Sequence, residues 1–328
     1  MKKFFLLPPL AILSLVSAFA QAPAGGNWPA HDPVMIKQDS VYYLFTTGGG
    51  IASSVDMTTW KREKPVFSSP PSWITPDMIP GFRGGGYWAP DIQLVNGDYF
   101  LYYSFSAFGK NTSVIGVATN KNLNSTSPDY KWNDHGPVVQ SVPGRDFWNA
   151  IDPNLVMDGN TGWLAFGSFW GGIKLVKLTP DLLSVAKPET WYTIAKRPRS
   201  PGLDDRDPGD GAIEAPFIYK HGAYFYLFVS IDYCCRGVNS TYKVVVGRSE
   251  KVEGPYIDRE GKRMTDGGGT LVSSGNEKWA ATGHSGHYDF DGKSYMIMHG
   301  YDKSDNGRSK LIVREMKWDN NGWPSIDL

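Results

Sequence analysis

A chemically reactive side chain stands ahead of an apolar run at five places along this chain, and the five places are evenly spaced. They are separated by 59, 61, 62 and 70 positions, and the side chains are Asp32, Asp91, Asp152, Glu214 and His284. The apolar runs, such as "VYYLFTT" and "YFYLFVS", are rich in aromatic and β-branched residues and are flanked by Gly, Asn and Asp turn signals. Each unit therefore has the pattern of successive strands rather than of a helix.

Repeated units of about four strands each are typical of a β-propeller, in which short sheets are arranged radially around a channel. Five units predict an all-β fold, a five-bladed β-propeller. Aromatic residues make up 14% of the chain, and 37 glycines and 23 prolines supply many turns, which is in keeping with an all-β protein. A long β-sandwich with coincidental spacing is the alternative.

In a propeller the first strand of every blade lines the central channel, so residues at the start of these strands converge. Asp32, Asp152 and Glu214 would then become neighbours, although they are far apart in sequence. Pro33 and Pro153 follow two of these acids, and we expect each proline to hold the preceding residue in extended geometry and so to aim its carboxylate. Converging carboxylates raise at least one pKa, and glycoside hydrolysis uses such a set directly as general acid and as base or nucleophile.

The N-terminal segment has the pattern of a cleaved secretory signal. Lys2 and Lys3 precede an apolar run that ends in a small-x-small sequence at Ala18 and Ala20. We expect residues 1–20 to be a signal peptide and residues 21–328 to form a single catalytic domain of a secreted or periplasmic protein. No later stretch approaches the length of about eighteen apolar residues that a membrane helix needs, so no membrane partner is expected.

The balance of charges limits the class of partner, and the cysteine content limits the disulfides that can form. The chain has 33 lysine and arginine residues against 33 aspartate and glutamate residues, which argues against a nucleic acid as a partner. We expect a monomer. The two cysteines, Cys234 and Cys235, are adjacent, and a strained vicinal disulfide and two buried free thiols both stay open as interpretations.

Five motifs carry a resemblance to a known family: "HDP", "WAPDI", "NAIDPNLV", "EAPFIY" and "YCCRGVNSTYKVVVGRS". Over nearly all of the mature chain, the sequence resembles the arabinanases of glycoside hydrolase family 43. The resemblance implies a five-bladed β-propeller that cleaves α-1,5-linked arabinan with inversion at the anomeric carbon. Carried over by position, it implies that Asp32 is the general base, Glu214 the general acid, and Asp152 the acid that tunes and orients Glu214.

The resemblance also implies a metal at His284. The matching histidine of the family holds calcium, or another small ion, in the channel with a shell that is mostly water. Ser285 follows it here, where the family motif is closer to "GHNS". A histidine that is hydrogen-bonded without a metal is the alternative, and we expect His31 and His287 to be structural or supporting residues.

Substrate contacts are expected from aromatic and polar residues near the channel mouth, because furanose rings stack on flat side chains. The predicted substrate-binding residues are Trp88, Asp91, Phe108, Asn149, Ser168, Trp170 and Arg236. Core packing is the alternative for the aromatic residues, and Asp91 could instead order the channel. We expect "GFRGGGY" at 81–87 to be an active-site loop and the charged segment 199–211 to be a solvated linker.

Two other functions fit the same pattern less well. An arabinofuranosidase or a β-xylosidase could use the same scaffold, because a fold does not fix the substrate. A non-catalytic carbohydrate-binding propeller would need the aromatic residues but not the carboxylates. The full set of acids therefore favours an enzyme.

Overall fold

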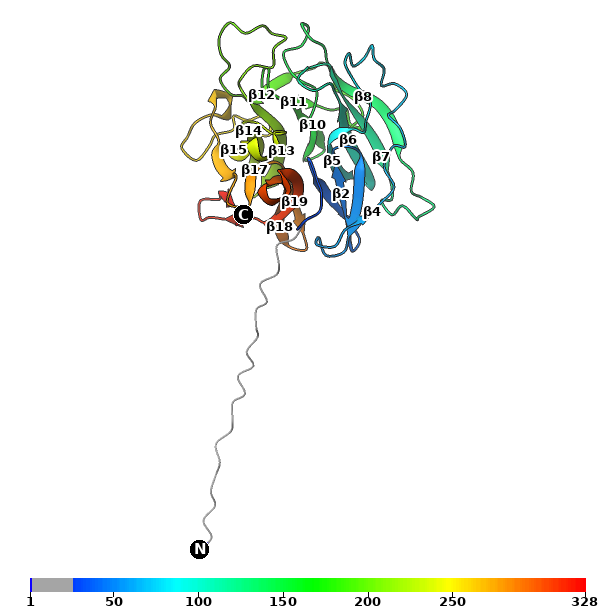
Figure 1. Cartoon of the computed structure of the whole chain (residues 1–328), viewed down its shortest axis with the longest axis vertical. Helices are drawn as coiled ribbons and strands as arrows, with labels where there is room; N and C mark the ends of the chain where they lie inside the picture. The colour runs from blue at the N-terminus through cyan, green and yellow to red at the C-terminus, as the bar shows by residue number, and fades with distance from the viewer. Residues whose placement is uncertain (2–25) are drawn as a thin grey trace.

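The computed structural model describes Met1 and residues 26–328, so the predicted signal peptide lies outside the described residues apart from its first residue. These residues form five antiparallel sheets that follow one another in chain order, together with a small two-stranded ribbon. Figure 1 shows the sheets arranged around the molecule, with the blue strands of the first next to the red strands of the last. The prediction of a five-bladed β-propeller is confirmed.

Within each blade the strands are paired in sequence order. The first blade comprises β1 (Val34–Gln38), β2 (Val41–Thr46), β3 (Gly50–Ser54) and β4 (Lys61–Arg62). The second comprises β5 (Trp88–Val95), β6 (Asp98–Phe105), β7 (Ser113–Asn120) and β8 (Asn133–Ser141). The third comprises β9 (Asn154–Asp158), β10 (Thr161–Phe166), β11 (Ile173–Lys177) and β12 (Trp191–Ala195). The fourth comprises β13 (Ile213–His221), β14 (Tyr224–Ile231), β15 (Lys243–Ser249) and β16 (Thr270–Ser273).

The fifth blade has three strands in its sheet, where the repeat predicts about four. They are β17 (Trp279–Phe290), β18 (Lys293–Asp302) and β19 (Arg308–Glu315), and the ribbon of β20 (Lys317–Trp318) and β21 (Pro324–Ser325) follows. Three short 3₁₀ helices complete the described elements: η1 (Gly237–Asn239), η2 (Met264–Asp266) and η3 (Lys303–Asp305). Among residues 26–328, no helix is long and apolar enough to cross a membrane.

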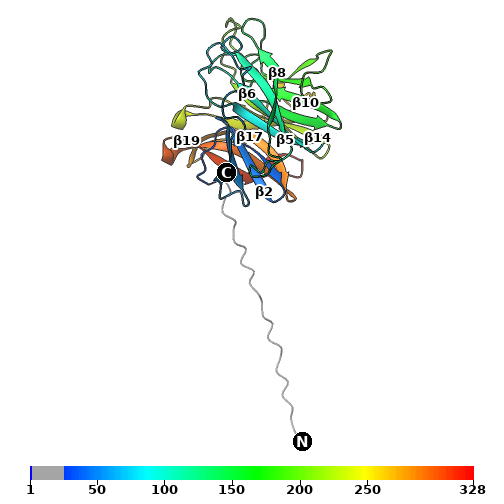
Figure 2. The same cartoon turned by 90° about the vertical axis from the view of Figure 1, so that its right-hand side faces the viewer.

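The start of the described chain takes the place of the missing strand. Pro29 forms an antiparallel bridge with Lys310 on β19. The Ala30 amide donates to the Ser309 carbonyl at 3.3 Å, and the Leu311 amide donates to the Trp28 carbonyl at 2.8 Å. Figure 2 shows the same neighbourhood of first and last blades from the side. The two ends of the domain thus close the ring and protect the edge of the last sheet.

The channel is surrounded by the first strand of every blade. β1, β5, β9, β13 and β17 each contact the next, and β17 contacts β1. Apolar side chains fill the wedges between blades, for example Phe100 with Leu155 and Phe166, and Val156 with Leu227. Each fully buried side chain of this size stabilises the fold by about 2 kcal/mol.

Each blade has a residue with left-handed backbone geometry either two residues before its inner strand, in the first and third blades, or within that strand, in the other three. These residues are Asp32 (φ 50°), Ala89 (φ 38°), Asp152 (φ 58°), Ala215 (φ 54°) and His284 (φ 52°). The expectation of extended geometry before proline is therefore wrong for both aspartates. A left-handed conformation is strained for residues other than glycine and is often retained at functional sites.

The true five-fold positions also differ from the predicted set. Ala89 occupies the position expected for Asp91, and Ala215 occupies the position expected for Glu214. Asp91 therefore lies two residues after the repeated position in its blade, and Glu214 lies one residue before it. In β5, β13 and β17 the ladder register shifts at this point, which marks a β-bulge. A bulge re-aims the neighbouring side chains, and a shift of one or two residues decides which of them face the pocket.

Candidate active site

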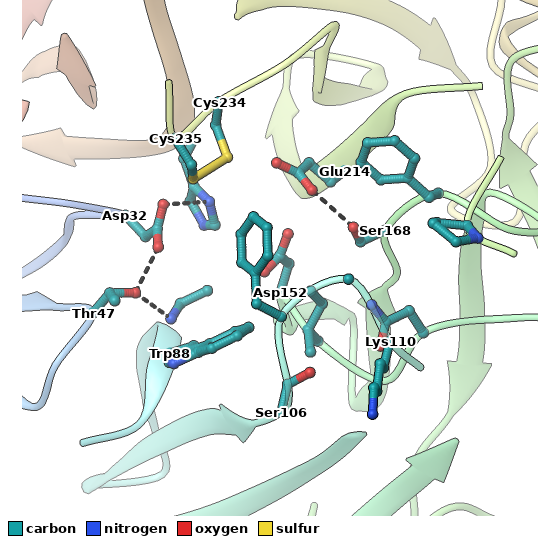
Figure 3. Close-up of a pocket in the computed structure, with 18 of the residues that line it drawn as sticks. Asp32, Thr47, Trp88, Ser106, Lys110, Asp152, Ser168, Glu214, Cys234 and Cys235 are labelled. Carbon is teal, nitrogen blue, oxygen red and sulfur yellow. Dashed lines mark hydrogen bonds and ion pairs between the residues drawn. A yellow bond between two sulfur atoms is a disulfide. The ribbon is translucent and has the colours of Figure 1, made fainter. Parts of the chain in front are cut away.

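A pocket of about 490 Å³ lies where the starts of the inner strands converge. Nearly all the predicted site residues line it: Asp32, Trp88, Phe108, Asn149, Asp152, Ser168, Trp170, Glu214, Arg236 and His284. Figure 3 shows Asp32 and Glu214 on opposite sides of the pocket, with Asp152 between them in this view. The fold therefore brings together three acids that come from three different blades.

Asp91 is the exception. It is only 1% exposed and does not line the pocket. Its Oδ2 accepts hydrogen bonds from the Leu155 amide at 2.7 Å and from Asn154 Nδ2 at 3.3 Å. Burial raises the pKa of Asp91 to about 7. Asp91 thus joins β5 to β9 and orders the channel wall, which is the alternative that the sequence left open for it.

Asp32 lies in a cluster of positively polarised groups. His284 Nδ1 is 3.0 Å from its Oδ1, and His31 Nδ1 is 2.9 Å from its Oδ2. The Thr47 hydroxyl donates to Oδ2 at 2.5 Å and accepts a bond from the Ala89 amide at 2.7 Å. Burial alone would raise the pKa of Asp32, but the charges and hydrogen bonds of His284 and His31 hold it well below its usual range. Asp32 is therefore ionised at neutral pH.

Two further side chains support this cluster and were not predicted from the sequence. The backbone amide of Asp32 donates to His299 Nδ1 at 3.1 Å, and the His31 ring stacks on the His299 ring at 4.3 Å. The Tyr301 hydroxyl is 3.2 Å from Nε2 of both histidines. One nitrogen or oxygen atom each of His31, Asp32 and His299 lie within 4.8 Å of one another, which is close enough for a metal; His31 Nδ1 bonds to the Asp32 carboxylate, whereas His299 Nδ1 is 3.7 Å from it.

The histidines around Asp32 differ in their affinity for a proton. Burial opposes a charge on His284, but Asp32, Asp152 and Glu214 together raise its pKa to about 9. Burial also opposes a charge on His31, and the Asp32 carboxylate outweighs it and raises the His31 pKa. Burial lowers the pKa of His299 well below its usual value. The two histidines that contact the carboxylate of Asp32 closely are therefore the ones that tend to be charged.

Asp152 lies in the opposite electrostatic environment. Its Oδ2 accepts a hydrogen bond from the Ala215 amide at 3.0 Å. Burial raises its pKa to about 8, against the charge of His284 and with the help of the negative charges of Glu214 and Asp32. Asp152 is therefore protonated at neutral pH, which limits the repulsion among the three acids.

Glu214 is fixed by two hydroxyl groups. The Ser168 hydroxyl donates to its Oε2 at 2.8 Å, and the Tyr242 hydroxyl donates to its Oε1 at 2.7 Å. Burial, followed by the negative charges of Glu214 and the two aspartates, raises the pKa of Tyr242 far above its usual value, so Tyr242 stays a donor. Ser168, which we expected to contact substrate, thus contacts Glu214, and Tyr242 was not predicted.

The aromatic residues of the wall fall into two groups. Phe108 is 80% exposed, so it offers a free ring face. Trp170 is buried, and its Nε1 donates to the Asp205 carbonyl at 3.1 Å. Arg236 lies over the Tyr233 ring at 4.0 Å.

Asn149 is also buried, and its Oδ1 accepts a hydrogen bond from the Ser113 hydroxyl at 2.6 Å. Phe108 is therefore the most accessible stacking surface, whereas Trp170 and Asn149 form the body of the wall.

Two loops differ from expectation. Pro208 and Gly209 line the pocket, so part of the segment 199–211 forms a wall of the site rather than a solvated linker. The segment 81–87, expected to be an active-site loop, contributes no lining residue, and Tyr87 at its end is buried.

The choice that the sequence left open for the cysteines is also resolved, because Cys234 and Cys235 are joined by a disulfide.

Comparison with known proteins matches residues 27–324 to the family described as "Glycosyl hydrolases family 43". The chain is 49% identical to an extracellular exo-α-(1→5)-L-arabinofuranosidase of Cellvibrio japonicus, over 90% of this chain and 86% of that protein. It is 42% identical to an extracellular endo-α-(1→5)-L-arabinanase of Bacillus subtilis, over 96% and 93%. A structure of Cellvibrio cellulosa α-L-arabinanase complexed with arabinohexaose is similar with a TM-score of 0.89 at 48% identity, over 92% and 96%. The chain therefore belongs to glycosyl hydrolase family 43 and is a glycoside hydrolase.

Proposed function

We propose that this enzyme hydrolyses α-1,5-linked L-arabinan with inversion at the anomeric carbon. The observation that carries the proposal is the convergence of Asp32, Asp152 and Glu214 from three blades on one pocket, where the pKa of Asp32 is held low and that of Asp152 is raised. Similar proteins that are named for α-1,5-arabinan or bind arabinohexaose support the substrate. An inverting glycosidase needs an ionised base and an acid on opposite sides of the scissile bond, and Asp32 and Glu214 lie on opposite sides of the pocket (Figure 3).

In the proposed reaction Asp32 takes a proton from a water molecule. The water oxygen forms a bond to the anomeric carbon while the bond from that carbon to the leaving oxygen breaks. Glu214 gives its proton to the leaving oxygen, so each group ends with the opposite protonation state. His284, His31 and Thr47 orient Asp32, and Ser168 and Tyr242 orient Glu214.

Asp152 tunes this reaction through its own proton. While Asp152 is neutral, its carboxyl group adds no negative charge to the pocket that it shares with Asp32 and Glu214. When Asp152 ionises at about its pKa of 8, the added charge disturbs the electrostatic balance of the site. We therefore propose that Asp152 sets the alkaline limit of activity.

We propose calcium, or another small cation, as a ligand of His284. His284 Nδ1 faces Asp32 at 3.0 Å, which is the carboxylate–histidine arrangement that commonly supports a metal on the other ring nitrogen. Calcium prefers oxygen ligands, so one imidazole would hold it only together with water, and the ion would replace the proton on the second ring nitrogen of His284. Such an ion would supply positive charge to a pocket of three acids. Thermal shift with and without calcium, in the wild type and in His284→Ala, measures this binding without an activity assay.

We also propose that the enzyme is exported, with residues 1–20 removed, and acts as a monomer. Two similar proteins are named extracellular, which supports export. Mass spectrometry of the protein recovered from the periplasm and the medium, together with its elution volume on a sizing column, tests both statements.

The test of the proposed function compares substrates and follows the product. Purified enzyme is incubated with linear arabinan, debranched arabinan and an aryl β-xyloside, and the anomeric proton of the first product is followed by NMR. We expect release from the arabinans with the β anomer formed first, and little reaction with the xyloside. Retained configuration, preference for the xyloside, or binding without release would each overturn the proposal. A time course of product length separates cleavage within the chain from cleavage at its end.

A further inference from the structure

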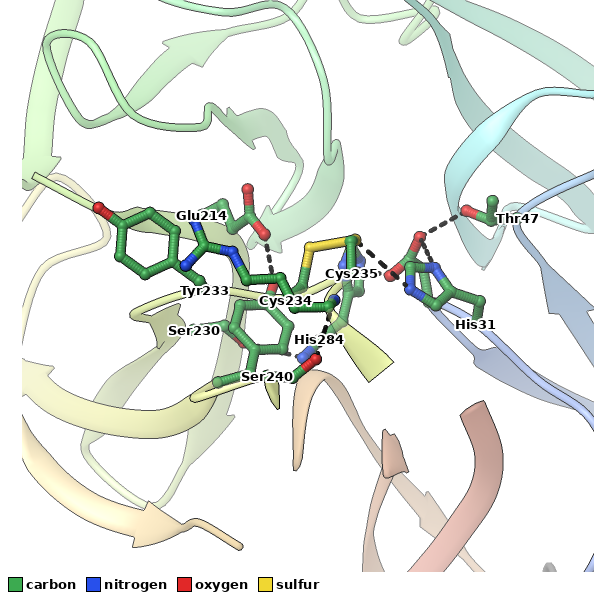
Figure 4. Close-up of a disulfide and its surroundings, with 12 residues drawn as sticks. His31, Thr47, Glu214, Ser230, Tyr233, Cys234, Cys235, Ser240 and His284 are labelled. Carbon is green, nitrogen blue, oxygen red and sulfur yellow. Dashed lines mark hydrogen bonds and ion pairs between the residues drawn. A yellow bond between two sulfur atoms is a disulfide. The ribbon is translucent and has the colours of Figure 1, made fainter. Parts of the chain in front are cut away.

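The disulfide lies inside the pocket rather than in the scaffold. Tyr233, Cys234, Cys235 and Arg236 follow the end of β14 and line the same pocket as the acids. Figure 4 shows the disulfide between Glu214 on one side and His31 on the other. A cross-link between adjacent residues closes almost no loop of the unfolded chain, so chain-entropy stabilisation of the fold does not explain it. Its position indicates a role in the site.

The disulfide turn is tied to the cluster around Asp32 through Tyr301. The Cys235 amide donates to the Tyr301 hydroxyl at 2.9 Å, and this hydroxyl is 3.2 Å from His31 Nε2. Cys235 Sγ lies 3.8 Å from the same nitrogen of His31. His31 in turn contacts Asp32 at 2.9 Å. A displacement of the turn would therefore be transmitted through three successive contacts to Asp32, the proposed general base.

The backbone of the turn has an unfavourable conformation at Cys235. Cys235 has left-handed geometry with φ of 65°, which is unfavourable for a residue other than glycine and persists only where the surroundings impose it. The disulfide is one such constraint, and the Arg236 amide bond to the Ser240 hydroxyl at 3.0 Å is another. Opening the disulfide frees the turn to relax and replaces an apolar pair of sulfur atoms by two thiols.

We propose that the Cys234–Cys235 disulfide is a substrate-contacting wall of the sugar pocket. Tyr301 is then the positioning residue that holds this wall in place relative to Asp32, the proposed general base. A disulfide has no N–H or O–H donor and presents a rigid, polarisable surface, which suits the C–H face of a furanose ring. The inference rests on the proposed function for the identity of the sugar. Glu214 lies on one side of the wall, and His31, which contacts Asp32, lies on the other, so a ring seated on the wall lies between the proposed acid and the proposed base.

The test is reduction of the wild-type enzyme by a water-soluble trialkylphosphine. Phosphorus attacks one sulfur, the S–S bond breaks, and the other sulfur leaves as a thiolate that takes a proton from water. Hydrolysis of the phosphorus–sulfur adduct then gives the second thiol and the phosphine oxide, so the disulfide gains two electrons and the phosphine loses them. Cys234 and Cys235 are the only cysteines in the chain, so the reagent has one target, and a thiol assay counts the two thiols formed.

We expect reduction to raise KM for arabinan and to lower kcat/KM by roughly tenfold, because small misplacements of positioned groups cost one to two orders of magnitude. Reoxidation should restore both values. Cys234→Ala/Cys235→Ala should show the reduced enzyme's kinetics and no response to the phosphine. Full reduction, by thiol count, with unchanged KM and kcat would overturn the proposal.

Tyr301→Phe separates the two parts of the proposal. It removes the hydroxyl that joins the turn to His31 but leaves the disulfide, so we expect kcat to fall several-fold more than KM changes. Equal effects on both constants, or none, would contradict a positioning role.

Binding of an arabino-oligosaccharide to Glu214→Gln, oxidised and reduced, needs no turnover. No binding in either form would defeat the proposed substrate, whereas equal binding in both forms would defeat only the role of the disulfide as a substrate-contacting wall.

Discussion

Asp32 and Asp152 occupy equivalent places in the first and third blades, yet they differ in chemistry. Both have left-handed geometry, both precede a proline and an inner strand, and both are nearly buried, at 8% and 6% exposure. The pKa of Asp32 is held well below its usual range, while that of Asp152 is raised to about 8. The same local motif therefore gives an ionised acid in one blade and a protonated acid in another.

The difference comes from residues that other parts of the chain place against each carboxylate. His31 and His284 approach Asp32, whereas Glu214 and the Ala215 amide approach Asp152. Burial raises the pKa of both acids; the charges and hydrogen bonds of His284 and His31 reverse this for Asp32, whereas the charge of His284 does not reverse it for Asp152. The repeat of the propeller thus supplies position, and the neighbours supply the function of each acid.

The largest effect is expected from removing the ionised member of the pair. Asp32→Asn should lower kcat on arabinan by roughly 10³- to 10⁴-fold, because general base catalysis contributes about this much. Initial rates and circular dichroism on the same sample measure the loss and the fold. Activity within tenfold of the wild type, in a folded variant, would show that Asp32 is not the base.

The protonated member should matter less for rate and more for pH dependence. Asp152→Asn should lower kcat by roughly 10²-fold through loss of positioning and should remove the alkaline limb that we expect at about pH 8 in the wild type. A profile of kcat/KM against pH measures both.

Asp91→Asn is the matched control, since Asp91 is equally buried but lies outside the pocket. It should keep wild-type kinetics. An alkaline limb that survives in Asp152→Asn would assign that limb to another group.

Removing a positively charged neighbour of Asp32 should raise the pKa of Asp32 toward that of Asp152. His31→Gln removes one partner of the carboxylate, so the pKa of Asp32 should rise and the acidic limb of kcat/KM should move up by about one pH unit. The exposed His135, replaced by Gln, is the control and should leave the limb in place. An unmoved acidic limb in His31→Gln would show that His284 alone holds Asp32 ionised.

The smallest effect is on stability, and its sign differs between the two acids. The folded pKa of Asp152 is raised, so stability falls as pH rises from about 4 to about 8, and Asp152→Asn should raise the free energy of unfolding at neutral pH by about 1–2 kcal/mol. The folded pKa of Asp32 is lowered, so its contribution is present above about pH 4 and is lost as pH falls, and Asp32→Asn should be destabilising at neutral pH. Denaturant unfolding at several pH values measures both, and equal signs would contradict the comparison.

The sequence pattern was enough to predict the blades and the three acids, because the repeat period and the Asp-Pro steps can be read directly from short stretches of the chain. It missed Thr47, Tyr242, His299 and Tyr301, because each becomes part of the site only through contacts between distant segments. It misplaced Asp91 because periodicity gives the neighbourhood of a strand start but not the bulge that shifts register by one or two residues. A proline after an aspartate was likewise compatible with a left-handed residue that general preference disfavours.

The opposite protonation of Asp32 and Asp152 is tested most directly by carboxyl carbon NMR of the aspartate-labelled enzyme. Asp32→Asn and Asp152→Asn assign the two signals. We predict that the Asp152 signal titrates with a midpoint at about 8, while the Asp32 signal stays that of an ionised carboxylate from roughly pH 5 to 9, a range above the ordinary pKa of aspartate. Two signals that titrate together at about pH 4, the ordinary value, would contradict the comparison between the two blades.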